Sequence, residues 1–266
     1  MVRSVNESNG ETPDLLVSRL RAAGCVFAED EARLLLAAAQ TPGELEALVV
    51  QRVAGLPLEQ LLGWVEFCGL RVAVGAGVFV PRRRTQFLVQ RAAALAVPGS
   101  VVLDLCCGSG AVGLALLDVV EGIELHASDI EPAAVECARH NIGARGQVYE
   151  GDLYAPLPPA LRGRVNLIVA NAPYVPTDAI ALMPSEARLY EPAVALDGGA
   201  DGLDVQRRLA AEAPDWLAPG GHLLVETSER QAPVSAEILS RVGMAVRTVR
   251  SEELDSTVVV GRPQPQ

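Results

Sequence analysis

An Asn-x-Pro-Tyr segment at the end of an apolar run suggests how this chain could hold an NH2 group. Residues 165–170 read VNLIVA, which predicts a short buried strand of a parallel sheet. Asn171, Ala172, Pro173 and Tyr174 follow directly. The Asn oxygen and a backbone carbonyl can each accept one amino hydrogen, while Pro stiffens the turn and Tyr offers a face for stacking. An ordinary loop leaving a strand is the alternative, because Asn and Pro are common in turns.

A glycine turn after an earlier apolar run predicts a nucleotide site. Residues 100–105 are expected to form a strand, which continues through Cys106 into a glycine turn and then into a helix. Gly108, Gly110 and Gly113 fit G-x-G-x-x-G, a pattern that dinucleotide-binding proteins share. The glycines alone therefore leave NAD and S-adenosylmethionine open.

Three carboxylates at the ends of predicted strands favour S-adenosylmethionine. Asp129 ends the next strand, where a carboxylate can hold both hydroxyls of a ribose. Asp152 follows the third strand and can meet the amino group of adenine, while Asp104 can approach the ammonium of a methionine moiety. Three surface carboxylates at loop starts are the alternative. The expected cofactor contacts are Asp104, Cys106, Gly108, Gly110, Asp129, Ile130, Asp152, Leu153 and Asn171.

Composition limits the classes of function. Half of the residues are hydrophobic, enough for a substantial core, and the formal net charge of −11 argues against a broad grip on nucleic acid. No apolar run approaches the ~20 residues that cross a bilayer, and the polar beginning of the chain lacks an apolar signal segment. We therefore expect a soluble cytoplasmic protein. The five cysteines include no C-x-x-C pair and the three histidines are scattered, so we expect reduced thiols and no metal site.

The chain is expected to divide into three parts. Residues 1–65 predict short helices, one of them starting at the capping-box segment 41–44, and form a substrate-recognition domain or a packing subdomain. Residues 66–83 predict a β-hairpin linker. Residues 84–262 alternate strands with helices, which predicts a mostly parallel α/β sheet covered on both faces. The predicted strands are 100–105, 123–129, 146–150, 165–170, 221–227, 244–250 and 256–261, and the helices are 86–96, 111–120, 132–142, 203–217 and 231–241.

Several motifs together resemble the HemK/PrmC-type protein-(glutamine-N5) methyltransferases. The resemblance implies a class I S-adenosylmethionine-dependent methyltransferase domain, Rossmann-like with a mostly parallel seven-stranded sheet, after a helical domain and a hairpin. It also implies methylation of the glutamine amide in the Gly-Gly-Gln loop of a peptide-chain release factor. The motifs that carry the resemblance are residues 77–82, 104–113, 129, 171–174, 190–196, 199–203 and Glu226.

The resemblance assigns roles to the residues of the Asn-x-Pro-Tyr segment. Asn171 and the backbone carbonyl of Ala172 would receive the glutamine NH2. Pro173 would shape the loop, and Tyr174 would flank the substrate. The family usually reads Asn-Pro-Pro-Tyr, and Ala172 in place of the first Pro still supplies its carbonyl.

A second departure from the family lies in the hairpin segment. The resemblance places Phe79 and Arg82 in a wall near the methyl group and the cofactor. The family hairpin usually ends Pro-Arg-Pro-Glu-Thr, whereas Arg83 and Arg84 replace Pro and Glu here. These arginines change the charge beside the substrate entrance, or they belong to a solvated turn.

Three other functions remain open. A nucleic-acid methyltransferase acting on adenine N6 or guanine N2 would use the same grip, although the net charge and the moderate length of residues 175–202 argue against it. A small-molecule methyltransferase is a second alternative. A non-catalytic interaction protein that keeps the fold is a third, and the presence of Asp129, Asn171 and Tyr174 argues against it.

Overall fold

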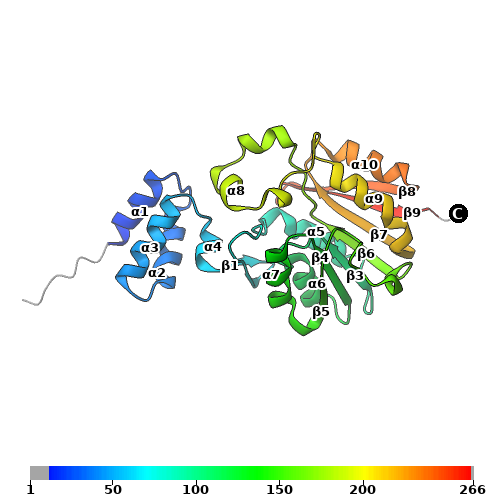
Figure 1. The fold of residues 1–266 in the computed structure, drawn as a ribbon, viewed down its shortest axis with the longest axis horizontal. Helices are drawn as coiled ribbons and strands as arrows, with labels where there is room; N and C mark the ends of the chain where they lie inside the picture. The colour runs from blue at the N-terminus through cyan, green and yellow to red at the C-terminus, as the bar shows by residue number, and fades with distance from the viewer. Residues whose placement is uncertain (1–11, 265–266) are drawn as a thin grey trace, which may run out of the picture. The chain divides into compact units, whose positions relative to one another are not determined.

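The computed structural model describes residues 12–264, and the chain forms two compact units (Figure 1). The first unit ends at Gly63 and the second begins at Trp64. Gly63 has a left-handed backbone, with φ of 76°, directly after helix α4 (Leu58–Leu62), which lets the chain leave the helix there. The sequence placed the end of the helical part at residue 65, which lies inside the strand that follows.

The helices of the first unit surround one apolar core, which includes Leu16, Leu20 and Leu35. A buried ion pair joins two of them, because Arg52 Nε donates to Glu31 Oε2 at 2.6 Å. A buried pair of this kind avoids leaving an isolated charge in the core. The helices are α1 (Pro13–Ala22), α2 (Ala28–Ala38), α3 (Pro42–Val53) and α4.

The predicted start of α3 is confirmed with one change in its capping. The Thr41 hydroxyl accepts a hydrogen bond from the Glu44 N–H at 3.2 Å, as expected of an N-cap residue. Glu44 Oε2 in turn accepts from the Gln40 N–H at 2.7 Å, one residue before the position that a capping box uses. The two bonds together fix the first turn of the helix.

The second unit begins with a hairpin that is shorter than predicted. Strands β1 (Trp64–Phe67) and β2 (Leu70–Ala73) pair antiparallel. Cys68 and Gly69 form the turn, both with positive φ (53° and 76°), which matches the right-handed twist of the two strands. The hairpin therefore occupies only the first half of the segment expected for it.

Residues 74–82 follow the hairpin and form no regular strand or helix. Val74, Val78 and Val80 are nevertheless buried together in a small apolar cluster. Their burial, rather than strand pairing, accounts for the apolar pattern that predicted a longer hairpin.

The rest of the second unit is built on a seven-stranded sheet with the order β5-β4-β3-β6-β7-β9-β8. The strands from β5 to β7 run parallel, whereas β9 pairs antiparallel with both β7 and β8. The predicted mostly parallel sheet is thus confirmed. The chain reverses its direction of winding between β3 and β6, which opens a crevice at the carboxyl ends of these strands. The strands are β3 (Val101–Leu105), β4 (Glu124–Asp129), β5 (Gly146–Glu150), β6 (Val165–Ala170), β7 (Leu217–Thr227), β8 (Met244–Ser251) and β9 (Ser256–Pro263).

Helices cover both faces of this sheet (Figure 1). Val102 of β3 packs in the same core as α5, α6 and α7, whereas Leu103 and Leu105 pack in the core under α9 and α10. This alternation is what a strand buried on both faces requires. Within the described part of the chain, no helix combines the length and the apolar character needed to span a membrane. The helices are α5 (Gln86–Ala93), α6 (Ala111–Val119), α7 (Pro132–Ile142), α9 (Asp204–Trp216) and α10 (Ala232–Arg241).

The structure adds short helical elements that the sequence did not predict. The segment 175–202, expected as a loop, contains helix α8 (Ser185–Tyr190) between 3-10 turns at Thr177–Leu182 and Ala193–Ala195. Another 3-10 turn, η1 (Arg83–Thr85), leads directly into α5. These elements belong to the segments that connect strands and helices, and such segments often carry binding residues.

Candidate functional site

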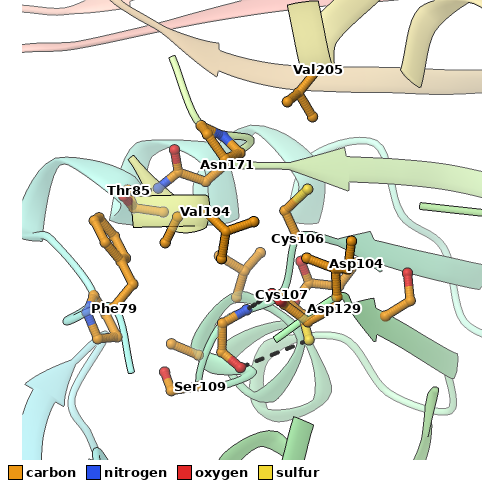
Figure 2. A pocket seen from close by; sticks show the side chains of 18 of the residues that line it. Phe79, Thr85, Asp104, Cys106, Cys107, Ser109, Asp129, Asn171, Val194 and Val205 are labelled. Carbon is orange, nitrogen blue, oxygen red and sulfur yellow. Dashed lines mark hydrogen bonds between the residues drawn. The ribbon is translucent and has the colours of Figure 1, made fainter. Parts of the chain in front are cut away.

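The carboxyl ends of β3, β4 and β6 open into a cavity (Figure 2). Its empty space, including open solvent at the mouth, is about 990 Å³. Most of the predicted site residues line it: Phe79, Asp104, Cys106, Gly108, Asp129, Ile130, Asp152, Leu153, Asn171 and Pro173. The other predicted residues, Arg82, Gly110, Ala172 and Tyr174, lie outside this lining.

The glycine turn after β3 is locked to the end of β4. Gly110 has a φ of 75° directly before α6, and a Cβ there would come within 3.2 Å of the Ala138 backbone. Only glycine combines this backbone conformation with so close an approach. The Gly108 N–H donates to Asp129 Oδ2 at 2.8 Å, so the turn and the carboxylate hold each other in place.

Asp129 is a fixed acceptor at the end of β4. Its Oδ1 accepts from the Glu131 N–H at 2.9 Å, in addition to the Gly108 bond on Oδ2. Burial raises the pKa of this carboxyl, while the N–H groups of Glu131 and Gly108 oppose the rise. A carboxylate held by backbone donors at this strand end suits the two hydroxyls of a ribose.

Asp104 is a buried carboxyl beneath the glycine turn, with 2% of its surface exposed. Its Oδ2 accepts from the Gly113 N–H at 2.9 Å. Burial, and to a lesser degree the charge of Asp129, raises the pKa of Asp104 to about 7, against the Gly113 bond that lowers it. A cation at this wall of the cavity would favour the ionised carboxylate, so the site fits an ammonium group.

Asp152 forms an ion pair with Arg208 at the cavity wall. The Asp152 bond is the main cause that raises the pKa of Arg208. Arg208 comes from α9 and was not predicted as a site residue. Its approach to Asp152 depends on how α9 packs against the sheet, so the sequence around Arg208 carries no signal of it.

The two cysteines of the glycine turn contribute shape rather than a nucleophile. Cys106 lines the cavity with a left-handed backbone, with φ of 55°, and Leu153 on the opposite loop has a φ of 47°. Non-glycine residues in this conformation are costly and are typical of functional sites. Burial, with the neighbouring carboxylates, raises the pKa of the Cys106 and Cys107 thiols, so both stay protonated at neutral pH.

The predicted amino-group acceptors lie at the end of β6. Asn171 lines the cavity, and its Nδ2 donates to the Thr85 hydroxyl at 3.3 Å. Ala172 and Pro173, the next two residues, are both buried. The segment is therefore not a free loop leaving a strand, because packing fixes both residues that follow Asn171.

Tyr174 is held by Arg84, which lies in an exposed turn, as one of the two alternatives expected, and also contacts the site. Arg84 Nη2 donates to the Tyr174 hydroxyl at 2.6 Å, and the guanidinium carbon lies 5.8 Å from the ring centroid. Burial raises the pKa of Tyr174, so its hydroxyl remains protonated. Arg83 and Arg84 are both exposed, and it is Arg84 that makes these contacts with Tyr174. We call residues 171–174 the acceptor segment. The replacement of Glu by Arg at position 84 therefore changes which side chain supports this segment.

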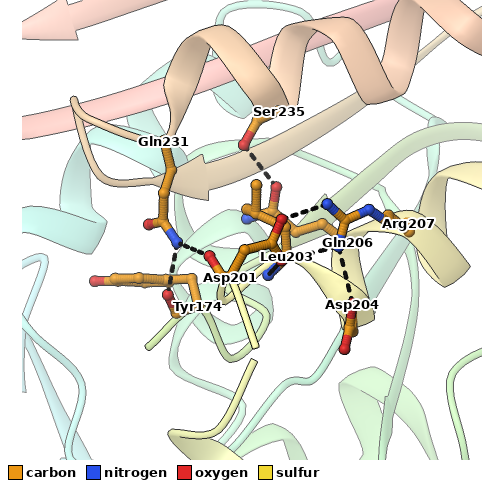
Figure 3. Close-up of polar contacts among 8 residues, drawn as sticks. All are labelled: Tyr174, Asp201, Leu203, Asp204, Gln206, Arg207, Gln231 and Ser235. Atoms are coloured by element: carbon orange, nitrogen blue, oxygen red, sulfur yellow. Dashed lines mark hydrogen bonds and ion pairs between the residues drawn. The ribbon is translucent and has the colours of Figure 1, made fainter. Parts of the chain in front are cut away.

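A glycine-rich loop braces the backbone of Tyr174 (Figure 3). Gln231 Nε2 donates to the carbonyl oxygens of Tyr174 at 2.9 Å and Asp201 at 3.0 Å. A Cβ on Gly202 would lie 2.3 Å from the Tyr174 oxygen, so no side chain fits there. The motif at 199–203 thus has a structural purpose, which is to let a second backbone approach the acceptor segment. Arg207 secures the loop through an ion pair with Asp201.

Arg82 supports the cavity wall from outside its lining. Its Nη2 donates to both carboxylate oxygens of Glu191, at 2.7 Å each. The Val80 N–H donates to the same carboxylate at 3.1 Å, and the Arg82 guanidinium carbon lies 4.8 Å from the Phe79 ring centroid. Phe79 and Val194 line the cavity on the two segments that this contact ties together.

Comparison with known proteins identifies close relatives of this chain. A family model described as "Methyltransferase small domain" matches residues 70–194. A Geobacter sulfurreducens protein named release factor glutamine methyltransferase is 39% identical over 208 residues, covering 76% of this chain and 72% of that protein. A protein of the same name from Mycolicibacterium smegmatis is 36% identical over 241 residues, covering 88% and 83%.

Solved structures of other methyltransferases share the fold. A methyltransferase from Pyrococcus furiosus superposes with a TM-score of 0.54 at 17% identity, covering 73% of this chain and 89% of that one. A ribosomal protein methylase from Lactobacillus delbrueckii subsp. bulgaricus gives 0.52 at 16% identity, covering 72% and 84%. The α/β fold is therefore that of the class I S-adenosylmethionine-dependent methyltransferases.

Proposed function

Because the chain belongs to the release factor glutamine methyltransferase family, we propose that it methylates the side-chain amide nitrogen of a glutamine in a peptide-chain release factor. The expected target is the glutamine of the Gly-Gly-Gln loop. One observation carries the proposal: the segment from Asn171 to Tyr174 lies at the end of β6, with Asn171 in the wall of a cavity that is lined by nucleoside-type acceptors. A glutamine side chain presents the NH2 group that such a segment can accept.

The residues of the cavity suit S-adenosylmethionine. The buried Asp104 would face the ammonium, Asp129 would hold the ribose hydroxyls and Asp152 would meet the adenine amino group. When bound, S-adenosylmethionine supplies an electrophilic methyl group on a positively charged sulfur.

The acceptor segment would make a poor nucleophile reactive. An amide nitrogen attacks weakly because its lone pair is delocalised into the carbonyl. Asn171 Oδ1 and the Ala172 carbonyl would each accept one N–H, which directs the nitrogen lone pair toward the cofactor side. Positioning of this kind can lower a barrier by up to ~7–11 kcal/mol. The two oxygens would also stabilise the positive charge that grows on nitrogen.

No strong base is required at the site. An N-alkylated amide is very acidic, so the nitrogen can release its extra proton to water after the N–C bond forms. The protonated thiols of Cys106 and Cys107 are not needed for this step. The site residues therefore act by holding and orienting the acceptor.

The proposal extends to partners and location. The helical first unit would recognise part of the release factor, since the second unit alone supplies the residues of the cavity. A cytoplasmic location follows from this substrate class, and the five free cysteines suit a reducing compartment.

The test is incubation of the purified protein with labelled S-adenosylmethionine and purified release factors, followed by mass mapping of the Gly-Gly-Gln peptide. One added methyl group on the glutamine supports the proposal. Label on nucleic acid or on other proteins, with none on that peptide, contradicts the substrate. Failure to bind S-adenosylmethionine would indicate a non-catalytic protein with the same fold.

A further inference from the structure

Glu226 is a buried carboxyl near the acceptor segment that the mechanism above does not use. It lies near the end of β7 with 1% of its surface exposed. Within residues 12–264, no donor forms a hydrogen bond with either of its oxygens at a normal distance and angle. The Thr85 hydroxyl and Arg84 lower its pKa, and the Arg84 Nε lies 3.5 Å from Oε1. The charge of Glu226 also acts on the Tyr174 hydroxyl. Buried acceptors without a strong partner are rare and call for an explanation.

Thr85 is the hydroxyl between Glu226 and the cavity. It is 3% exposed, at the end of the η1 turn, and it lines the cavity. A hydroxyl carries one hydrogen to donate and two lone pairs to accept with. Burial raises the pKa of Glu226, while Thr85 and Arg84 oppose the rise. In its ionised form the carboxylate can only accept, so the Thr85 hydrogen is then directed toward Glu226 and the lone pairs of Thr85 remain for another partner.

Asn171 is that partner. Its Nδ2 donates to the Thr85 hydroxyl at 3.3 Å, and no hydrogen bond from the described residues reaches its Oδ1. The reverse orientation of the amide would set Oδ1 against a hydroxyl lone pair, since the hydroxyl hydrogen is engaged elsewhere. The contact with Thr85 thus decides which end of the Asn171 amide is free to meet a ligand.

We propose that Glu226 and Thr85 are positioning residues that fix the orientation of the Asn171 side-chain amide. We call the series Glu226–Thr85–Asn171 the relay. In it, the carboxylate accepts from the Thr85 hydroxyl, so that hydroxyl must accept from the Asn171 Nδ2. Asn171 then presents Oδ1 to the substrate. This oxygen is the only atom of the side-chain amide that can accept a hydrogen bond from the NH2 group to be methylated. The inference rests on the proposed function for the identity of that acceptor, but any NH2 acceptor would need the same orientation.

The test compares Thr85→Val, which has the same shape without the hydroxyl, with Thr85→Ser, which keeps the hydroxyl. Steady-state methylation of the release factor gives kcat and KM, and calorimetry gives the Kd of S-adenosylmethionine. We expect Thr85→Val to lower kcat by roughly 10–100-fold, by analogy with the loss of a hydrogen-bond partner that orients a metal ligand, with an unchanged cofactor Kd. Thr85→Ser should stay within about threefold of the unmodified protein.

A double-mutant cycle separates the relay from simple packing. Gln in place of Glu226 can donate to Thr85 and turn its hydroxyl toward Asn171, so E226Q should also lower kcat without changing the cofactor Kd. Because Glu226 acts through Thr85, E226Q should add little to the loss in a T85V background. Losses that multiply in the double variant would overturn the relay, and so would a T85V protein of normal kcat or a T85S protein as slow as T85V.

Two controls keep this outcome distinct from failure of the proposed function. An unmodified protein that leaves the Gly-Gly-Gln glutamine unmodified contradicts the substrate assignment, whereas an active protein with a normal T85V variant contradicts only the relay. Thermal unfolding of each variant identifies a folding defect. Should T85V fail to fold, T85S and E226Q still decide the inference, since a normal kcat in E226Q would overturn it.

Discussion

The Nη2 atom of Arg82 lies 2.7 Å from each carboxylate oxygen of Glu191, although 109 residues separate the two in the chain. The Glu191 side chain is 1% exposed and that of Arg82 is 35% exposed. The contact joins the segment after the hairpin to the segment after α8. Each of these segments contributes an apolar side chain to the cavity wall, Phe79 on one and Val194 on the other.

Arg82→Ala should destabilise the protein by about 2–3 kcal/mol. Removing one partner of a buried ion pair leaves a buried charge and costs about 3–5 kcal/mol, and the partial exposure of Arg82 reduces that value here. Urea denaturation, followed through the transition in which the second unit unfolds, measures the loss in free energy of unfolding. Arg83→Ala at the neighbouring exposed position is the matched control and should change stability by less than about 0.5 kcal/mol. Equal effects of the two substitutions would show that the Glu191 contact contributes nothing.

Asn171→Ala should lower kcat by about 10²–10³-fold, the usual loss when one stabilising group of a transition state is removed. The cofactor acceptors Asp104 and Asp129 lie on other strands and keep their backbone donors. The Kd of S-adenosylmethionine, measured by calorimetry, should therefore stay nearly constant. A parallel loss of turnover and cofactor affinity would contradict the assignment of Asn171 to the acceptor.

Asp104 should make cofactor binding depend on pH. The pKa of about 7 means that the folded protein holds a proton there which the methionine ammonium would displace. Affinity for S-adenosylmethionine should therefore rise from pH 5.5 to pH 7.5, approaching about tenfold per pH unit below pH 7. Asp104→Asn should bind weakly and without this slope. A flat profile in the unmodified protein would exclude a charge interaction at Asp104.

The same pKa predicts an opposite effect on stability. A carboxyl whose folded pKa lies above its unfolded value of 3.8 favours folding below that value and loses this contribution as the pH rises toward 7. Asp104→Asn keeps an acceptor for the Gly113 N–H and removes the charge. The variant should be more stable than the unmodified protein at pH 8, by up to about 4 kcal/mol. Melting curves at pH 5 and pH 8 measure the difference, which should be less than half as large at the lower pH and vanish only below the unfolded pKa of 3.8.

Arg208→Gln should raise the KM for S-adenosylmethionine by roughly 3–10-fold and leave kcat nearly unchanged. Arg208 pairs with Asp152, the residue proposed to meet adenine, whereas the segment 171–174 follows another strand. An exposed ion pair contributes modestly, which limits the expected effect. Arg207→Gln on the same helix is the control, since Arg207 pairs with Asp201 and not with Asp152. A loss confined to kcat would show that Arg208 acts on the acceptor instead.

The cavity residues that could be predicted from the sequence are those that lie at the ends of strands. Asp104, Asp129 and Asn171 each end or follow an apolar run, and parallel strands bring their carboxyl ends to one edge of the sheet. The order of alternating elements was enough to predict the sheet, because β3 and β6 read as buried strands on their own.

The supports of these residues could not be predicted from sequence. Arg84 stands in a run of three arginines that is typical of a solvated turn, and only the folded chain brings it to Tyr174. Arg208 of α9 and Gln231, the residue before α10, likewise reach the site from segments whose sequences show no motif. Such contacts depend on helix packing and on side-chain direction, which periodicity does not determine.

Gly202 limits how this enzyme could be re-engineered. A Cβ there would stand 2.3 Å from the Tyr174 carbonyl oxygen, so the two loops must be exchanged together or not at all. If only the acceptor segment of another methyltransferase were grafted, its backbone would pack against a Gly202 loop that fits the present course of the Tyr174 backbone. Libraries aimed at new substrates should therefore keep Gly202 and vary the exposed rim, beginning with Arg83 and Val194.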